Sequence, residues 1–583
     1  MTHRFSVWAP SVEEVQLRLG DRSEQMHRAH GGWWEADVED AGPGTRYGYV
    51  LDGGPTRPDP RSPSQPDGPD GLSAVVDHAA FRWNDHAWRG MPLQGAVLYE
   101  LHVGTYTASG TFEAVEERLG HLVELGVDGV ELMPVVEFPG RRGWGYDGVD
   151  LYAPHHAYGG PEGLKRLVDA CHRAGLGVVI DVVYNHLGPA GNYLPEFGPY
   201  FSDTHRTNWG AAVNFDGPGS DEVRRFVLDN ALMWLRDYHV DGLRLDAVHS
   251  IVDDSARHIL EEMAAEVEAL ACHVRRPLFV IAESDLNDPR FVRSPAAGGY
   301  GLDAVWADEW HHALHAVTTG ERSGYYEDFG SLAQLAKALR QGWVYDGCYS
   351  PHRGRRHGRP PAGVAGHQLV VFTQNHDQIG NRAVGERLTR LASDGRLRVA
   401  AALLLCGPFV PMLFQGEEWG ATTPFRYFTD HPDPQLGRAV SEGRRREFAH
   451  FGWDPEEVPD PQAPATFEAS QLDWDERYRP GHAELLAWYR TLIALRRRHP
   501  DLSDPRLDRV TAQADEAAGT IVCTRGGTTL FVNLGDGERA FAAAAGATVL
   551  AASDARIRLD EGRIVVPPDA VAVVDGRPAG SSS

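Results

Sequence analysis

Between about residue 95 and residue 425, short apolar runs alternate with longer amphipathic stretches. The runs are AVLYELHV, VDGVELMPV, LGVVIDVVYNH, VDGLRLDAVH, LFVIAES, LDAVWADEW, LVVFTQNHD and FVPMLFQGEEW. The stretches between them, such as DEVRRFVLDNALMWLRDYH, repeat apolar positions with the period of a helix. Buried strands that alternate with helices predict a parallel sheet with right-handed crossovers. Eight strands predict an α/β fold of the (β/α)₈ TIM barrel type, whereas one miscounted strand would leave an open doubly wound sheet.

The two ends of the chain follow a different pattern. FSVWAP, VQLRL, GWWEADV and YGYVL alternate apolar and polar residues between turn residues, which predicts an N-terminal β-sandwich over residues 1–85. Its last part, RPDPRSPSQPDGPDG at residues 57–71, is predicted to be an extended surface linker. Residues 86–500 are assigned to the barrel, its loop insertions and trailing helices. GTIVCTRGG, TTLFVNLGD and RIVVPPDAVAVVDG predict a small C-terminal β-sandwich over residues 501–583, with a short disordered tail.

Charge and composition narrow the classes of partner. Acidic residues outnumber basic ones, 82 against 56, and the net charge of −26 argues against binding to nucleic acid or to an anionic membrane. No run of about 18–20 apolar residues predicts a transmembrane helix, and MTHRFSVWAP lacks the pattern of a signal peptide. The cysteines have no paired spacing, which is typical of reduced thiols. They are Cys171, Cys272, Cys348, Cys406 and Cys523. We therefore expect a cytoplasmic protein with a neutral or cationic partner.

Polar residues follow every predicted barrel strand. In a barrel, the C-terminal ends of the strands converge on one mouth, where the chemistry takes place. The residues at these ends are Glu100, His102, Glu131, Asp181, Asn185, His186, Arg244, Asp246, Glu283, Asp308, His376, Asp377, Glu417 and Glu418. A shared polar site explains so many titratable groups better than separate packing roles do.

Three of these carboxylates fit the cleavage of a glycosidic bond. Arg244 and Asp246 are two apart on a strand and share a face, so the guanidinium should keep Asp246 ionised as a nucleophile. Glu283 has no cation in its immediate sequence, so burial should keep it protonated as a general acid. One carboxyl that attacks carbon and one that protonates the leaving oxygen are what this reaction needs. Asp377 could bridge sugar hydroxyls and distort the ring.

Each candidate has a structural alternative. An Asp two residues after an Arg is often an ordinary ion pair, and a Glu at a strand end often caps a helix. Tyr146, in GWGYD, could pack in the core instead of stacking on a sugar, and residues 310–312 could begin a structural helix. Asn185 and His186 could bind Ca²⁺ or cap a loop. Because no second set of oxygen ligands is clustered with them, no metal is predicted.

Four stretches resemble the signature regions of the α-amylase family of glycoside hydrolases. DVVYNH matches the first region, GLRLDAVH the second, IAES the third and FTQNHD the fourth, in the order of the family. The resemblance implies a retaining mechanism without metal or organic cofactor, in which Asp246, Glu283 and Asp377 are the catalytic residues. It implies contacts with the sugar for Tyr146, His186, Arg244, His249 and His376. The FSVWAP block is similar to the glycogen-type carbohydrate-binding modules of branching and debranching members.

Finer motifs are similar to the branch of this family that releases trehalose. They are VLYELHVGTYTASGTF, DVVYNHLGPAGNYLPEFGPYF, TQNHDQIGNR and GEEWGATTPFRYFTDH. This resemblance implies a monomer that cleaves the α-1,4 bond next to a terminal trehalose. The implied substrate is an α-glucan oligosaccharide whose trehalose end is made by a separate synthase. Loops after the sixth and seventh strands would line the groove through Asp308, Trp310, His311, His312, Gln378 and Asn381.

Two other functions compete with this interpretation. Glycogen branching enzymes share the N-terminal module, the barrel and the three carboxylates, but they transfer a glucan to a 6-hydroxyl, so release of free trehalose discriminates between the two. A different class comprises carbohydrate-binding or transporter-associated proteins with an inactive barrel. Such relatives lose carboxylates of the triad, and all three are present here.

Overall fold

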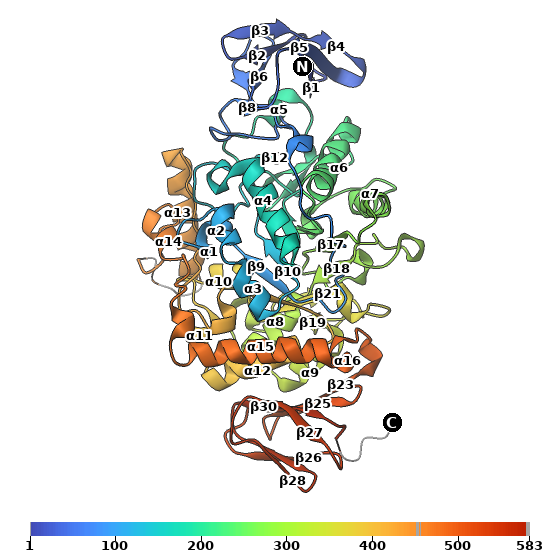
Figure 1. The fold of residues 1–583 in the computed structure, drawn as a ribbon, viewed down its shortest axis with the longest axis vertical. Helices are drawn as coiled ribbons and strands as arrows, with labels where there is room; N and C mark the ends of the chain where they lie inside the picture. Colours follow the sequence, from blue (N-terminus) through green and yellow to red (C-terminus); the bar gives the residue numbers. More distant parts are fainter. Residues whose placement is uncertain (1, 451–453, 455, 579–583) are drawn as a thin grey trace.

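The middle of the molecule is a closed barrel. The computed structural model describes residues 2–450, 454 and 456–578, and within them eight parallel strands pair in chain order, the last with the first. The predicted (β/α)₈ TIM barrel is confirmed (Figure 1). Its strands are β9 (Leu98–Leu101), β10 (Gly129–Leu132), β13 (Gly177–Val182), β16 (Gly242–Leu245), β17 (Phe279–Ala282), β18 (Ala304–Trp306), β21 (Leu369–Phe372) and β22 (Val410–Phe414).

Burial on both faces explains the near-continuous apolar sequence of these strands. Every residue of the eight strands is buried, inside by the barrel core and outside by helices. The covering helices include α4 (Gly160–Arg173), α6 (Ser220–Asp237), α7 (Ile259–Val274), α8 (Asp308–Thr319) and α12 (Asp394–Leu405). Among the described residues, no helix combines the length and the apolar character that crossing a bilayer requires.

Two β-hairpins are inserted next to the C-terminal ends of the barrel strands. The first, after β10, consists of β11 (Val136–Glu137) and β12 (Asp150–Pro154). The second, after β13, consists of β14 (Phe201–Thr207) and β15 (Gly210–Val213). Because both follow C-terminal strand ends, their loops lie beside the mouth of the barrel.

An N-terminal module of antiparallel strands lies at one end of the long axis (Figure 1). The alternation predicted from the sequence is confirmed; in β2, for example, Val15, Leu17 and Leu19 are buried and the residues between them are half-buried. One sheet contains β1 (Thr2–Trp8), β5 (Trp33–Glu39) and β4 (His27–Arg28). The other contains β3 (Arg22–Gln25), β2 (Val15–Leu19), β6 (Arg46–Leu51), β7 (Thr56–Arg57) and β8 (Ser73–Ala74).

The prediction of a surface linker at residues 57–71 is wrong. Most of this segment is buried or half-buried, although it is rich in turns. The hydroxyl of Tyr47 donates a hydrogen bond to Asp59 at 2.8 Å, and Arg61 forms an ion pair with Asp229 of α6 at 2.8 Å. Proline and glycine exclude regular elements, but they do not exclude burial when the polar groups find partners. The segment therefore joins the N-terminal module to the barrel.

A C-terminal β-domain lies at the opposite end of the molecule (Figure 1). In the described part of the chain its larger sheet contains β23 (Val510–Asp515), β24 (Thr520–Arg525), β25 (Thr528–Asn533), β30 (Ala570–Asp575) and β27 (Thr548–Ala552). The smaller sheet contains β26 (Arg539–Ala542), β29 (Arg563–Val566) and β28 (Arg558–Asp560). The small β-domain expected from the sequence is confirmed. Most of the tail predicted to be disordered, residues 579–583, lies outside the described residues.

A buried arginine connects the C-terminal domain to the barrel. Arg525 of β24 donates hydrogen bonds to the backbone carbonyls of Cys406 and Gly407, between α12 and β22, and of Leu502, each at 2.8 Å. Arg496 of α15 (His482–Arg498) donates to the same Gly407 carbonyl at 2.7 Å. Buried backbone carbonyls that lose their donors are costly, so these contacts should hold the two domains together.

We predict that Arg525→Met weakens this junction. The change removes the arginine donor from the Cys406 carbonyl and leaves Gly407 and Leu502 with Arg496 alone, so it should destabilise the protein by about 2–3 kcal/mol. Thermal unfolding followed by calorimetry should show a lower transition, and limited proteolysis should release the C-terminal domain sooner. Arg558→Met is the matched control, because that arginine lies on the exposed edge of the same domain and is paired with Glu538 at 3.3 Å. Equal effects of the two changes would contradict the assignment.

Candidate active site

A cavity of about 730 Å³ opens at the C-terminal ends of the barrel strands. We call it the mouth cavity. It brings together ten of the fourteen residues predicted from the sequence to form the site. They are Tyr146, His186, Asp246, His249, Glu283, Asp308, His312, Asp377, Gln378 and Asn381. The three carboxylates proposed to be catalytic follow three different strands, β16, β17 and β21, and share this one cavity.

Asp246 is held at both of its carboxylate oxygens. Its Oδ1 accepts a hydrogen bond from Arg244 Nη1 at 2.9 Å, and its Oδ2 accepts one from Asn185 Nδ2 at 2.9 Å. Arg244 points into the barrel because it lies between Leu243 and Leu245, whose side chains point outward to the helices. A charged and a neutral donor together fix the orientation of the carboxylate.

Glu283 lies on the same guanidinium as Asp246, although the residues around it in sequence include no cation. Its Oε2 is 3.4 Å from Arg244 Nη2 and also accepts a hydrogen bond from the backbone N–H of Ala247. Burial still raises the pKa of Glu283 well above its ordinary value; Arg244 opposes this shift and Asp246 adds to it. This direction favours the protonated carboxyl that a general acid needs. Since Oε2 is an acceptor, Oε1 is the oxygen that can carry the proton.

A chain of hydrogen bonds fixes the residues beside Asp377. His376 is paired through Nδ1 with Glu100 at 2.5 Å and through Nε2 with the hydroxyl of Tyr146 at 2.7 Å. Burial disfavours the charged imidazole, but the carboxylates of Asp377 and Glu100 outweigh it and raise the pKa of His376 to about 9. Both ring nitrogens therefore carry protons at neutral pH. The imidazolium is 3.5 Å from Asp377 Oδ2 and helps to position that carboxylate.

Tyr146 connects this chain to the buried arginine. It lies in the loop between β11 and β12, and its hydroxyl donates a hydrogen bond to Asp181 Oδ2 at 2.6 Å. That same oxygen is 2.7 Å from Arg244 Nη1. The ring of Tyr146 also stacks on His376 with a centroid separation of 5.3 Å. The tyrosine presents an aromatic surface to the cavity in a fixed orientation, as a platform for a sugar ring requires.

Arg244 and His376 lie directly beneath the mouth cavity instead of lining it. Both side chains are almost completely buried. They can act on a sugar only through the groups that they hold: Arg244 through Asp246 and Glu283, and His376 through Asp377 and Tyr146. The contact of these two residues with substrate stays a prediction, and the contacts in the structure give both of them a positioning role.

Helix α8 separates the residues predicted after the sixth strand into two groups. Asp308 and His312 are four residues apart, so they share a helix face, and both line the mouth cavity. Trp310 and His311 do not reach it. Trp310 is fully buried in the hydrophobic core, and His311 bonds the backbone carbonyl of Thr373. For these two residues the alternative of a structural helix describes the geometry better. They lie between Asp308 and His312 in sequence, so their side chains are on other faces of the helix.

The two titratable groups of α8 that line the cavity have shifted pKa values, and the neighbouring amides form hydrogen bonds. Burial, together with Asp285 and Asp377, raises the pKa of Asp308 to about 7. Burial and the charge of Arg353 lower the pKa of His312 to about 3, so its imidazole is neutral. Gln378 Oε1 accepts a hydrogen bond from Tyr325 at 3.3 Å, and Asn381 Nδ2 donates to Asp377 Oδ1 at 3.3 Å. Neutral donors and acceptors of this kind suit hydroxyl recognition.

Several residues that line the mouth cavity were not predicted from the sequence. They are Trp144, Asp147, Asn208, Trp209, Asp285, Tyr325, His352, Arg353, Tyr427, Arg444 and Glu447. Trp209 lies in the turn between β14 and β15, is 51% exposed and stacks on His186 with a centroid separation of 5.3 Å. A tryptophan in an exposed hairpin turn was the one signal that could have marked it. The others come from separate loops without a shared spacing.

Not every polar strand end faces the cavity. Glu418 accepts a hydrogen bond from Tyr99 at 3.1 Å and is paired with His121 at 2.7 Å, while Glu417 accepts one from Thr373 at 2.6 Å. Both glutamates are buried away from the mouth. Asn185, the candidate calcium ligand, uses its amide nitrogen for Asp246 and its oxygen for His186 Nδ1, at 2.5 Å. Its polar atoms are thus already engaged within the protein.

Comparison with known proteins agrees with this geometry. The profile of the alpha amylase catalytic domain matches residues 81–209, and that of carbohydrate-binding module 48, the isoamylase N-terminal domain, matches residues 1–60. A malto-oligosyltrehalose trehalohydrolase of Arthrobacter ramosus is 55% identical over 531 residues, which are 90% of this chain and 92% of the relative. This chain belongs to the malto-oligosyltrehalose trehalohydrolase family. It is a glycoside hydrolase of the α-amylase type.

Two further proteins are similar to this chain over different shares of its length. The crystal structure of a Salmonella typhimurium protein described as an alpha amylase has a TM-score of 0.90 at 40% identity, over 98% of both chains. A 1,4-alpha-glucan branching enzyme of Rubrobacter xylanophilus is 33% identical over 354 residues, which are 53% of this chain and 48% of its own. The trehalohydrolase resemblance extends over nearly the whole chain, whereas the branching enzyme shares about half.

We predict that His376 remains protonated through neutral pH. NMR of protein with labelled histidines, assigned by comparison with His376→Gln, should give a pKa of about 9. Glu100→Gln should lower that pKa, because it removes one of the two carboxylates that stabilise the imidazolium. The pKa of His376 in the folded protein lies above the ordinary 6.5. Protonation of His376 therefore stabilises the folded state fully below about pH 6.5, and this contribution is lost as the pH rises through 9. A midpoint at or below 6.5 would contradict this prediction.

Proposed function

We propose that this chain hydrolyses the α-1,4-glucosidic bond next to the terminal trehalose of a malto-oligosyltrehalose, with retention of configuration. The products are trehalose and a malto-oligosaccharide. One observation supports this most directly: Asp246 and Glu283 share a single buried guanidinium, and burial raises the pKa of Glu283 well above its ordinary value. A carboxylate and a carboxylic acid beside one cavity are the pair that retaining glycosidases use.

The chemistry takes two displacements. Asp246 attacks the anomeric carbon while Glu283 gives its proton to the glycosidic oxygen, and the trehalose unit leaves. The glucan is then bound to Asp246 as an ester. Glu283, now a carboxylate, takes a proton from a water molecule that attacks the same carbon. This step releases the malto-oligosaccharide and regenerates both groups.

Asp377 is assigned to the sugar ring that undergoes reaction. It lines the mouth cavity, where the imidazolium of the preceding residue, His376, and the amide of Asn381 hold its carboxylate. A carboxylate fixed in this way can accept hydrogen bonds from two ring hydroxyls. These bonds strengthen as the ring flattens toward the oxocarbenium geometry, so they stabilise the transition state more than the ground state.

The trehalose unit is proposed to lie on the side of Glu283, because that residue must reach the leaving oxygen. Two walls of this side offer polar groups. Asp308 and His312 come from α8, and Asp285 comes from the loop after β17, where it pairs with Arg353 at 3.1 Å. Trehalose is bent and non-reducing, since its two rings are joined through both anomeric carbons. Buried polar groups left unpaired by a straight maltodextrin end would penalise that substrate.

The malto-oligosaccharide is proposed to lie on the opposite side, along the two hairpins. Tyr146 comes from the β11–β12 loop, and Trp209 comes from the β14–β15 turn. The exposed face of Trp209 can stack on a glucose ring, since sugar rings present apolar C–H faces. His186 supports the indole from behind.

The proposed setting follows from the substrate. A trehalose terminus has to be made by an enzyme that joins two anomeric carbons, so this hydrolase would act after such a synthase. We propose a cytoplasmic monomer that needs no organic cofactor. The five cysteines, all of which lie in the described part of the chain, are unpaired, which supports a reducing compartment.

The test of specificity compares maltosyl-trehalose with maltotetraose, which contain the same number of glucose units. We expect maltosyl-trehalose to turn over about tenfold faster or more, because a discrimination of 1–2 kcal/mol from unpaired polar groups suffices. NMR should show free trehalose and, at first, the α-anomer of maltose. Equal rates would contradict the proposed specificity. New α-1,6 linkages without trehalose would instead indicate a branching enzyme.

The two catalytic carboxyls should respond differently to amide substitution. Asp246→Asn should abolish turnover of every substrate, because it removes the nucleophile. Glu283→Gln should slow natural substrates by roughly 10²–10⁴-fold and slow the first step of activated aryl glycosides much less, because such leaving groups need little protonation. Steady-state and pre-steady-state kinetics measure both effects, with Glu261→Gln on the surface of α7 as control. Equal losses on both substrate types in Glu283→Gln would remove its role as the acid.

A further inference from the structure

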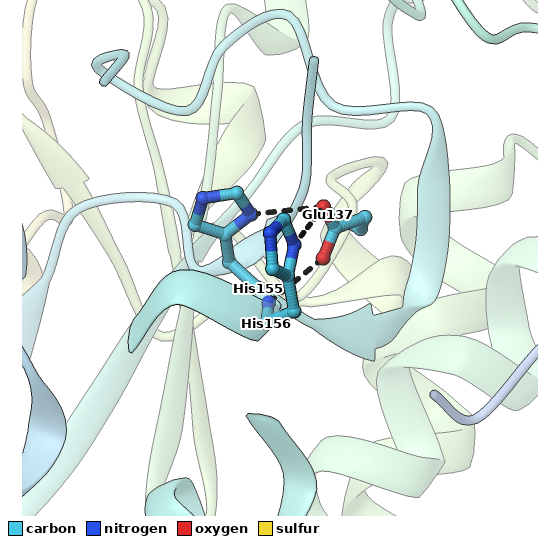
Figure 2. Close-up of side chains that lie close together, drawn as sticks. All are labelled: Glu137, His155 and His156. Carbon is cyan, nitrogen blue, oxygen red and sulfur yellow. Dashed lines mark hydrogen bonds and ion pairs between the residues drawn. The ribbon is translucent and has the colours of Figure 1, made fainter. Parts of the chain in front are cut away.

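A histidine–glutamate cluster lies at the base of the first hairpin, outside the mouth cavity. Glu137 ends β11, and His155 and His156 follow the end of β12 (Figure 2). Both imidazoles direct Nδ1 toward the same carboxylate oxygen, Glu137 Oε1, at 3.1 Å for His155 and 2.8 Å for His156. The three ligand atoms lie within 4.8 Å of one another.

Local structure brings these residues together. Strand β11 pairs with β12 through an irregular register, in which Val136 is opposite Pro154 and Glu137 is opposite Asp150. The irregularity turns the Glu137 side chain toward the residues that follow β12. The backbone N–H of His156 then donates to Glu137 Oε2 at 2.8 Å, which fixes the carboxylate. The cluster is therefore preorganised by the hairpin.

We propose that Glu137, His155 and His156 bind a divalent transition metal ion such as Zn²⁺. Two histidines and one carboxylate form the facial ligand set that leaves further coordination positions open. Ligands at about 2.1 Å from an ion lie about 3.0 Å apart at right angles and about 3.4 Å apart in a tetrahedron, so the nitrogen–oxygen distances of 3.1 and 2.8 Å would open by roughly 0.3–0.6 Å around a tetrahedral zinc ion. Imidazole nitrogen favours zinc and its neighbours over calcium or magnesium, which prefer oxygen.

A bound ion would take the place of the hydrogens on Nδ1 of His155 and His156. Without metal, each Nδ1–H donates to Glu137. The ion takes both Nδ1 positions, so a charged imidazole releases its proton and each neutral ring carries its hydrogen on Nε2. Nε2 of His155 has no hydrogen-bond partner among the described residues, so this change breaks no bond there. It also means that no outer partner orients the ring, which should weaken binding roughly 10–100-fold relative to a fully supported site.

An ion could reach the cluster from solvent, and its position would affect the hairpin loop. The side chains of Glu137 and His155 are fully buried, whereas that of His156 is 27% exposed and provides the route of entry. The loop that the cluster closes, residues 138–149, carries Trp144, Tyr146 and Asp147 into the mouth cavity. A metal at its base would hold both ends of that loop and restrict the motion of Tyr146.

A second group of possible ligands serves as an internal comparison. His205, Asp216 and Asp254 lie near the second hairpin, and they too have ligand atoms within 4.8 Å of one another. This group has one nitrogen ligand, and its members are half-buried or exposed. Fewer nitrogen ligands and greater hydration make it the poorer zinc site.

The experiment uses the full-length protein without a histidine tag, after treatment with a chelator. Zn²⁺ titration by calorimetry and metal analysis after gel filtration should give one ion per chain, with release of protons near neutral pH. Co²⁺ in place of Zn²⁺ should give the visible absorption of a site with nitrogen and oxygen ligands. Zn²⁺ should also raise the melting temperature of the wild type.

Variants locate the site. His156→Gln, at the partly exposed position, should fold and lose the bound ion, the proton release and the rise in melting temperature; Glu137→Gln should do the same if it folds. Asp216→Asn is the matched control and should keep all three. The proposal is overturned if the wild type binds no zinc at micromolar concentrations. It is equally overturned if His156→Gln retains the ion, or if Asp216→Asn is the variant that loses it.

Discussion

The active site depends on one buried cation shared among several acids. Arg244 is fully buried and lies within 3.4 Å of carboxylate oxygens of Asp181, Asp246 and Glu283. One positive charge cannot compensate three carboxylates equally, because each desolvated anion needs its own compensation. Burial raises the pKa of Asp181 to about 6 and that of Glu283 well above its ordinary value. Asp246, which also has the amide of Asn185, is the group best supplied with donors. Unequal sharing of the guanidinium therefore distinguishes the carboxyl proposed as nucleophile from the one proposed as acid.

The barrel stabilises these charged groups around Arg244, which would be costly to bury elsewhere in the protein. Its strands are apolar on both faces and place polar residues only where they end. Beneath the mouth, Glu131 is buried, and desolvation raises its pKa well above its ordinary value, which favours the neutral acid over an uncompensated anion. The face of Trp306 covers the guanidinium of Arg244 at 4.2 Å. Apolar packing around the charges excludes water, which strengthens the interactions that fix Asp246 and Glu283.

Sequence patterns predicted what depends on short-range periodicity and failed where contacts join distant segments. The eight strands were visible because burial on both faces leaves continuous apolar runs. Arg244 and Asp246 were found together because residues two apart on a strand share a face. The contact of Arg244 with Glu283 was not visible, since it arises only when β16 pairs with β17. Trp310 and His311 were misplaced for the opposite reason: being near Asp308 in sequence does not place side chains on the same face of a helix.

The choice between related reactions lies in the loops and not in the shared carboxylates. After the first displacement, a hydrolase and a glucan transferase hold the same intermediate on the same aspartate, and they differ in whether water or a sugar hydroxyl attacks it. A departing trehalose has no free anomeric carbon, so the polar groups proposed to bind it, Asp308 and the Arg353–Asp285 pair, would have to bind a different shape to retain an ordinary glucan acceptor. Poor retention of that acceptor favours attack by water. Recognition of the leaving group therefore also determines the fate of the intermediate.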